Sequence, residues 1–149
     1  MSSLTQRPAT NADLDMMYSI LRESLHAYVE QVYGPWDDIA QRARFDAVTQ
    51  VEHHTMLELD GRPIGFTCIT RPPGEIYLNR IMILPEFQNR GLGSQVLRKV
   101  IEQGDRDGLP IRLRVMKVNP ARRLYERNGF VLTDESNTHY MMERLPQPF

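Results

Sequence analysis

Apolar residues in the first quarter of the chain recur every three or four positions. They are Leu14, Met17, Leu21, Leu25, Tyr28, Val29 and Val32. This repeat places them on one face of a helix, so it predicts an amphipathic helix with a buried side. Thr10 and Asp13 form an aspartate version of the capping box before it, and Gly34-Pro35 marks its end. Leu4–Ala9, which precedes the cap, is a candidate for a first short strand.

A second helix follows, and then the period changes from helical to strand-like. Asp37 or Asp38 can cap a helix that runs to about Val48. Three segments with strand character come next, and Asp60-Gly61 offers a turn between the first two. They are Thr55–Leu59, Pro63–Thr70 and Glu75–Leu84. The third is apolar on both faces, which is typical of a central strand.

Helical and strand-like periods alternate again in the second half. One helical face carries Leu92, Val96, Leu97, Val100 and Ile101. Ile111–Val115 alternates strictly, which predicts a strand with one apolar and one basic face. A short helix fits between Asn119-Pro120, a favourable start, and Asn128-Gly129, a favourable stop. Phe130–Leu132 and His139–Glu143 can then form a closing hairpin.

The resulting order of elements is β-α-α-β-β-β-α-β-α-β-β. This order predicts an α+β or mixed α/β fold, with helices on the faces of a sheet. No internal repeat, low-complexity tract or linker interrupts the chain. We therefore expect residues 1–149 to form a single domain.

The composition fits the soluble globular class of proteins. Of the 149 residues, 41% are hydrophobic and 25% are charged, as in ordinary domains. No run approaches the roughly 18 apolar residues of a membrane helix, and the first residues lack the apolar core of a signal peptide. Cys68 is the single cysteine, so an internal disulfide is excluded and packing is its expected role. A cytoplasmic location is the resulting expectation.

Charge is unevenly distributed along the chain, although the net charge is only −1. Residues 80–130 contain eleven Arg and Lys and five Asp and Glu, a balance of +6. The remainder contains seven and fourteen, a balance of −7. This division suits a chain that holds an anionic ligand on one part and meets a cationic one on another. A chance partition of surface charge explains it equally well, and the small net charge does not suggest a nucleic-acid-binding protein.

A glycine-rich stretch, Gln88-Asn-Arg-Gly-Leu-Gly-Ser94, lies between the apolar strand and the next helix. The first turn of a helix offers unpaired N–H groups and the positive end of a dipole, so this position favours an anion. Gly91 and Gly93 let the backbone approach a ligand closely, and Arg90 adds positive charge. The spacing differs from that of the nucleoside-triphosphatase loop. By itself, a Gly-x-Gly pair also fits an ordinary tight turn.

Two longer motifs carry a resemblance to a known family. Leu84-Pro-Glu-Phe-Gln-Asn-Arg-Gly-Leu-Gly-Ser94 resembles the acetyl-CoA signature Gln/Arg-x-x-Gly-x-Gly/Ala of the GNAT (general N-acetyltransferase) superfamily. Asn119-Pro-Ala-Arg-Arg-Leu-Tyr-Glu-Arg-Asn-Gly-Phe130 resembles that superfamily's second signature. The predicted order of elements is also similar to the GNAT fold. The resemblance therefore implies a central, mostly antiparallel sheet flanked by helices.

The resemblance implies acetyl-CoA as co-substrate and no metal. In the family, the coenzyme's pyrophosphate lies on the loop and helix start, and its pantetheine arm lies beside the preceding strand. The corresponding residues are Gln88, Asn89, Arg90, Gly91, Leu92, Gly93 and Ser94 for the pyrophosphate and Ile81, Met82 and Ile83 for the pantetheine arm. Asn119, also a helix cap, would contact the pantetheine arm.

The resemblance also implies two groups that act on the reacting atoms. Tyr125 matches the family tyrosine that faces the sulfur. Its ordinary pKa of about 10 keeps it protonated, so it would donate a proton to the departing thiolate. A core aromatic is the alternative role of Tyr125. A backbone N–H near Met82 would stabilise the oxyanion.

The general base is not identified by the sequence. Many relatives carry a glutamate on or near the central strand, where this chain has Asn79 and Arg80, and Glu75 stands at the start of that strand. Further titratable candidates, each of which also fits a surface residue, are Glu30, Asp37, Asp38, His26, His53, His54 and His139. A base acting through water, or none, suits an acceptor amine with a pKa near 8.

The acceptor is expected at the join of the first two helices. Aromatic and acidic side chains cluster there: Glu30, Tyr33, Trp36, Asp37 and Asp38. Aromatic walls and negative charge suit a cationic amine. A plain helix–helix connection packed by Trp36 fits the same residues equally well.

Together these features predict an acetyl-CoA-dependent N-acetyltransferase that moves an acetyl group directly to an amine of a small molecule or peptide. One alternative is a catalytically silent acyl-CoA-binding sensor or interaction module on the same fold. Another is transfer to a protein's N-terminus, which would require a long open groove. The expected partner is therefore an amine acceptor, with neither nucleic acid nor membrane, and homodimers are common among proteins that resemble this one.

Overall fold

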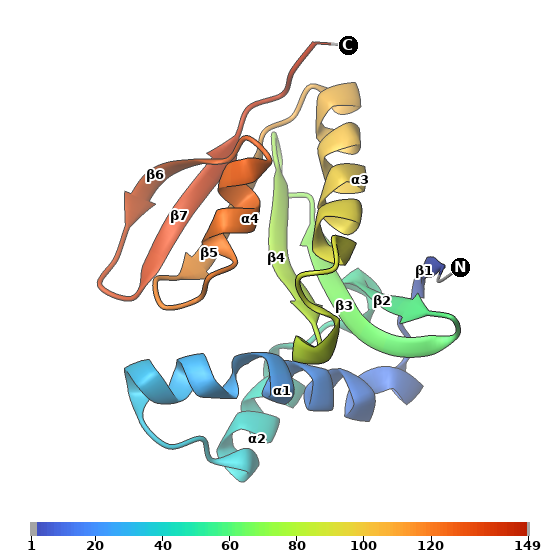
Figure 1. Ribbon diagram of the computed structural model, residues 1–149, viewed down its shortest axis with the longest axis vertical. Coiled ribbons are helices and arrows are strands. Elements are labelled where there is room, and N and C mark those ends of the chain that lie inside the picture. The colour runs from blue at the N-terminus through green and yellow to red at the C-terminus, as the bar shows by residue number, and fades with distance from the viewer. Residues whose placement is uncertain (1–2, 149) are drawn as a thin grey trace. The chain divides into compact units, whose positions relative to one another are not determined.

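Within residues 3–148, which the computed structural model describes, seven strands form one sheet in the order β1-β2-β3-β4-β5-β7-β6 (Figure 1). They are β1 (Leu4–Pro8), β2 (His54–Leu59), β3 (Arg62–Thr70), β4 (Ile76–Ile83), β5 (Ile111–Met116), β6 (Val131–Glu135) and β7 (His139–Arg144). β4 and β5 pair in parallel, whereas β1 with β2, β2 with β3, and β7 with both β5 and β6 pair antiparallel. The predicted α+β fold with a mostly antiparallel sheet is confirmed.

The helices follow the predicted order. They are α1 (Leu14–Tyr33), α2 (Asp38–Val48), α3 (Leu92–Asp107) and α4 (Arg122–Arg127), with short 3-10 helices at Asn11–Asp13, Val51–His53 and Pro85–Phe87. The predicted capping box is present, since the Asp13 carboxylate accepts the Thr10 N–H at 2.8 Å. Asp37 is the cap of α2 and accepts the N–H groups of Ile39 and Ala40. No helix in the described part of the chain is long and apolar enough to cross a membrane.

The last helix begins later than predicted. Asn119-Pro120 is a favourable helix start, but α4 begins at Arg122. The Asn119 side chain accepts the Ala121 N–H at 2.9 Å, and the Pro120 carbonyl accepts the Arg123 N–H at 3.0 Å. The Asn-Pro pair therefore forms a turn of its own before the helix, and Asn119 caps that turn.

Contacts between residues group the chain into two compact units, and β4 contributes to both. The first unit comprises the described residues up to Cys68 together with Arg80–Gln88. Its core joins α1 and α2 to β2 and β3, and its buried members are Ala9, Met17, Ile20, Phe45, Met56 and Phe66. Figure 1 shows α1 and α2 as neighbours joined by a short connection.

Within this unit, β3 and the end of β4 approach each other unusually closely. A Cβ added at Gly65 would lie 2.1 Å from the Met82 carbonyl oxygen. The Leu84 N–H donates to the Ile64 carbonyl at 2.9 Å beside this contact. The φ of Gly65 is not in the left-handed region. Glycine is therefore required here by the lack of space for a side chain and not by the backbone conformation.

The second unit comprises Ile69–Asn79 and the described residues from Asn89 onward. The buried face of α3 is Leu92, Val96, Leu97, Val100 and Gly104. β5 alternates as predicted: Arg112 and Arg114 are exposed, while Ile111, Leu113 and Val115 are buried. Gly104 lets α3 lie close to β5, since an added Cβ would lie 3.1 Å from Ile111 side-chain atoms.

We predict that Gly65→Ala lowers the free energy of unfolding by about 1–3 kcal/mol, because the added methyl group forces β3 away from the Met82 carbonyl. Urea denaturation measures this change. Gln6→Ala, at an exposed position of β1, is the control and should stay within about 0.5 kcal/mol of wild type. A Gly65→Ala protein as stable as the control would contradict the close contact.

Candidate active site

The loop before α3 brings the predicted pyrophosphate-binding residues together. Gly91 is the N-cap of α3 with φ +79°, and Asn89 is also left-handed at φ +63°. The first main-chain hydrogen bond of α3 runs from the Gln95 N–H to the Gly91 carbonyl at 3.1 Å. The N–H groups of Leu92–Ser94 precede that bond and therefore have no acceptor within the helix.

The surroundings of this loop suit a negatively charged ligand. A Cβ at Gly91 would meet no atom within 4 Å, so the space beside this glycine is open. The first turn of α3 contains no acidic residue, and the exposed Arg90 precedes Gly91. Unpaired amides at the positive end of a 16-residue helix can hold a phosphate or diphosphate.

The end of β4 is fixed by two side chains of the first unit. The Gln88 side-chain amide donates to the Ile83 carbonyl at 2.8 Å, and the Ser24 hydroxyl donates to the same oxygen at 3.2 Å. Ile83 is buried, and Ile81 and Met82 are half-buried. Gln88, predicted to contact the coenzyme, therefore also ties the loop to the strand before it.

Tyr125 lies on α4 and is 6% exposed. Its ring meets Phe130 edge-on at 5.8 Å between centroids. Burial alone raises the pKa of Tyr125 above its ordinary value, so the phenol keeps its proton across the neutral and mildly alkaline range. Asn119 lies in the turn that precedes α4, in the same unit.

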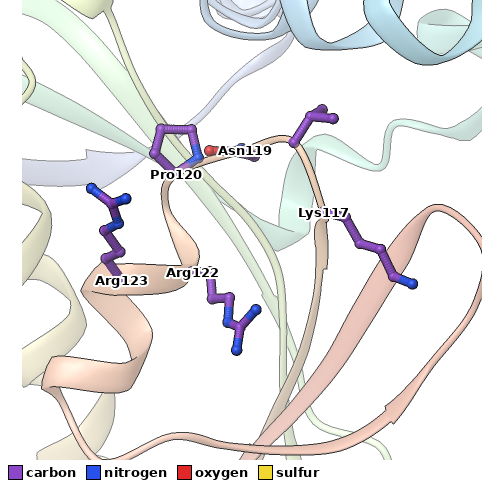
Figure 2. Close-up of a pocket in the computed structure, with 6 residues that line it drawn as sticks. Lys117, Asn119, Pro120, Arg122 and Arg123 are labelled. Atoms are coloured by element: carbon purple, nitrogen blue, oxygen red, sulfur yellow. The ribbon is translucent and has the colours of Figure 1, made fainter.

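A hollow of about 290 Å³ adjoins the Asn119-Pro120 turn. Its lining is basic, which was not predicted from the sequence. Figure 2 shows Asn119 and Pro120 on the loop between Lys117, Arg122 and Arg123. Lys117 and Arg122 both lie over the ring of Tyr140, at 5.3 and 4.3 Å from its centroid. The sequence could have indicated this basic hollow, because three basic residues lie within a few positions of the Asn119-Pro120 pair.

The predicted acceptor residues are brought together, chiefly through Asp38. Its Oδ1 accepts the Tyr18 hydroxyl at 3.0 Å, Trp36 Nε1 at 3.0 Å and Arg22 Nε at 2.9 Å. These hydrogen bonds, led by that of Tyr18, hold the pKa of Asp38 below its ordinary value. Asp38 is thus a carboxylate whose charge is balanced by Arg22.

The other predicted acceptor residues share this connection between α1 and α2. Glu30 accepts the Trp36 backbone N–H at 3.1 Å, and Asp37 caps α2. Tyr33 is 64% exposed. Four of these five side chains are therefore engaged: Glu30 and Asp37 bind backbone groups, and Trp36 and Asp38 bind side chains.

The candidate bases are also engaged in hydrogen bonds, apart from the exposed His53. The Nδ1 atoms of three histidines lie 2.7–2.9 Å from an oxygen: His26 with Arg22, His54 with Gln50 and His139 with Thr138. Glu75 forms an ion pair with Arg112. Burial lowers the pKa of His54 and of His139.

A known protein family matches most of this chain. Residues 14–130 match the sequence model of the acetyltransferase (GNAT) family. The match covers well over half of the chain, so this protein belongs to the GNAT family of N-acetyltransferases. The predicted family and enzyme class are confirmed. No curated protein sequence matches the chain.

Solved structures of several acetyltransferases share this fold. The PaiA N-acetyltransferase of Thermoplasma acidophilum, solved with coenzyme A, has a TM-score of 0.80 at 19% identity and covers 96% of this chain and 99% of its own. The ribosomal-protein-S18-alanine N-acetyltransferase of Escherichia coli has a TM-score of 0.70 at 20% identity, covering 100% and 97%. A histone acetyltransferase HPA2-related protein of Corynebacterium glutamicum has a TM-score of 0.73 at 20% identity, covering 97% of each chain.

We predict that Asp38→Asn lowers the thermal midpoint at pH 7 and that the difference from wild type shrinks at low pH. The folded pKa of Asp38 lies below its unfolded value of about 3.9. Its stabilisation is therefore fully present above that unfolded value and is lost as the pH falls through the folded pKa. Melting curves between pH 3 and 7 test this, with Glu102→Gln on α3 as the control. A difference that is constant over this range would contradict the role of the charge.

Proposed function

We propose that this protein transfers an acetyl group directly from acetyl-CoA to an amine of a small molecule or peptide. The observation that carries the proposal is the left-handed start of α3 at Gly91, which leaves three main-chain amides unpaired beside open space. Family membership supports acetyl transfer as the reaction. A protein of the same fold was solved with coenzyme A, which supports acetyl-CoA as the acetyl donor.

The residues present fit the coenzyme. The amides of Leu92–Ser94, with Arg90 and the backbone of Asn89, would hold its pyrophosphate. The main chain of Ile81–Ile83 would lie along the pantetheine arm, and Asn119 would contact that arm. When bound, acetyl-CoA supplies an acetyl group activated as a thioester.

The reaction then needs a proton donor and a hydrogen bond for the oxyanion. The amine nitrogen bonds to the acetyl carbonyl carbon, the carbon–sulfur bond breaks, and Tyr125 gives its proton to the sulfur. A β4 backbone N–H near Met82 donates a hydrogen bond to the carbonyl oxygen as negative charge develops on it. The proton that the amine loses restores Tyr125 through solvent, so the reaction requires no separate strong base.

Thiol release measures the proposed activity. The protein is mixed with acetyl-CoA and a panel of amines, and free coenzyme A is followed with a thiol reagent. Release that requires an amine supports transfer. Tight coenzyme binding without release over a broad panel would instead support a silent acyl-CoA-binding module.

We predict that Gly91→Ala lowers the affinity for coenzyme A about fivefold or more. A left-handed alanine costs about 1–2 kcal/mol, so the loop relaxes and its amides move. Titration calorimetry measures the affinity. Gly74→Ala is the matched control, because Gly74 has φ +81° and lies in the loop between β3 and β4, outside the coenzyme loop. Equal affinities of the two variants would argue against the amide site.

We predict that Tyr125→Phe lowers kcat about 100-fold or more and leaves coenzyme affinity within about twofold, because the phenyl ring fills the same space without a proton to donate. Steady-state kinetics and calorimetry measure both quantities. Tyr140→Phe on β7 is the control. Since the pKa of Tyr125 is raised, wild-type kcat should also show no loss from phenol ionisation below about pH 10. An unchanged kcat in Tyr125→Phe would contradict the proposed role of Tyr125 as proton donor.

A further inference from the structure

Arg80, on the part of β4 that belongs to the first unit, is a half-buried cation in an unusual setting. Its guanidinium carbon lies 5.7 Å from the centroid of the Phe45 ring. Its Nη1 donates to the Thr49 hydroxyl at 3.4 Å, a long hydrogen bond. Both neighbours come from the end of α2 and its C-cap.

No carboxylate balances this charge within residues 3–148. Every ion pair found there joins other residues, and no acidic side chain contributes to the electrostatics of Arg80. Loss of hydration lowers the pKa of Arg80, which reflects the same lack of compensation. A guanidinium that has lost water without gaining an anion is costly, and buried charges in proteins are normally paired.

The buried polar groups closest to Arg80 are a histidine and a cysteine, and Glu52 acts on the histidine rather than on Arg80. His54 and Cys68 face each other across β2 and β3 and are 4% and 8% exposed. His54 donates from Nδ1 to the Gln50 carbonyl, and its Nε2 is the one buried side-chain nitrogen or oxygen without a hydrogen-bond partner in the described chain. The charge of Arg80 is close enough to lower the pKa of both groups, against the larger rise that burial causes at Cys68. This region therefore offers a cation and an unused hydrogen-bonding atom.

We propose that Arg80 anchors a carboxylate of the acceptor, so that the amine acetylated by this protein belongs to a molecule such as an amino acid. The proposal rests on the proposed function, because it takes the thioester to lie beside Ile81–Ile83. Arg80 precedes Met82 by two residues on the same strand. Their side chains therefore share one face, with Cα atoms roughly 7 Å apart.

The acidic residues of the same unit support this choice of charge. Asp38 is already balanced by Arg22, and Asp37 is occupied as a helix cap. Asp37 and Asp38, expected from the sequence to attract a cationic acceptor, are therefore engaged, whereas the Arg80 guanidinium has no carboxylate partner within residues 3–148. A guanidinium binds a carboxylate through two parallel hydrogen bonds, which also fixes the orientation of the bound molecule.

The test compares amino acids with their carboxamides as acceptors. Glycine, β-alanine, 4-aminobutyrate and 6-aminohexanoate place the carboxylate at increasing distance from the amine. Rates of thiol release are expressed per unprotonated amine, since the amides have lower amine pKa values. For at least one length, kcat/KM for the acid should exceed that of its amide by at least about 30-fold, the factor for a lost buried charge pair.

Variants of Arg80 test whether this residue causes the preference for the acid over its amide. Arg80→Gln should lower kcat/KM at least about 30-fold for the preferred acid but less than about threefold for its amide, and Arg80→Lys should retain part of the preference. Arg44→Gln, an exposed arginine of α2, is the matched control. A general loss of structure would lower both rates together. If Arg80→Gln does not fold, the acid-to-amide ratios of wild type and of Arg80→Lys decide.

Equal rates for acids and amides in wild type would overturn the anchor and leave the transferase intact. If neither the amino acids nor their amides cause thiol release, the result would instead contradict the proposed function. Calorimetry of the same amino acids on the coenzyme-loaded protein then decides the anchor. Saturable binding to wild type but not to Arg80→Gln supports it, and absence of binding overturns it.

Discussion

The backbone conformation at Gly91 is the constraint on which the candidate active site depends. Its φ of +79° turns the loop into α3 and leaves the amides of Leu92–Ser94 without helical acceptors. Upstream, Gln88 ties the loop to the end of β4 through the Ile83 carbonyl. Downstream, the missing side chain of Gly104 lets α3 lie against β5. One left-handed residue thus begins α3 and exposes the amides of its first turn, on which the proposed coenzyme site depends.

Most of the fold could be predicted because local pattern and tertiary environment agree. The alternation in Ile111–Val115 became alternating burial in β5, and the capping signals before α1 and α2 are used as expected. The start of α4 could not be predicted, since Asn119-Pro120 suits a turn as well as a helix start. The division of β4 between two compact units depends on contacts between distant segments, which periodicity does not record.

The two sides of the candidate site differed in how far sequence could describe them. The proposed coenzyme loop is contiguous, so Gln88–Ser94 could be predicted from one short motif. The predicted acceptor side, by contrast, depends on side chains far apart in sequence. The bond from Tyr18 to Asp38 spans 20 residues, and it converts an apparent cation-binding carboxylate into part of a structural network. Arg80 is visible in the sequence, but its lack of a balancing anion exists only in three dimensions.

The network around Asp38 separates a fixed frame from an exposed surface. Polar bonds from Tyr18, Arg22 and Trp36 fix the connection between α1 and α2, whereas its neighbours Tyr33 and Ile39 are 64% and 85% exposed. Surface positions of this kind tolerate replacement with little loss of stability. Replacements at Tyr33 or Ile39 can therefore change the chemistry of this surface while the hydrogen bonds beneath it keep the two helices joined.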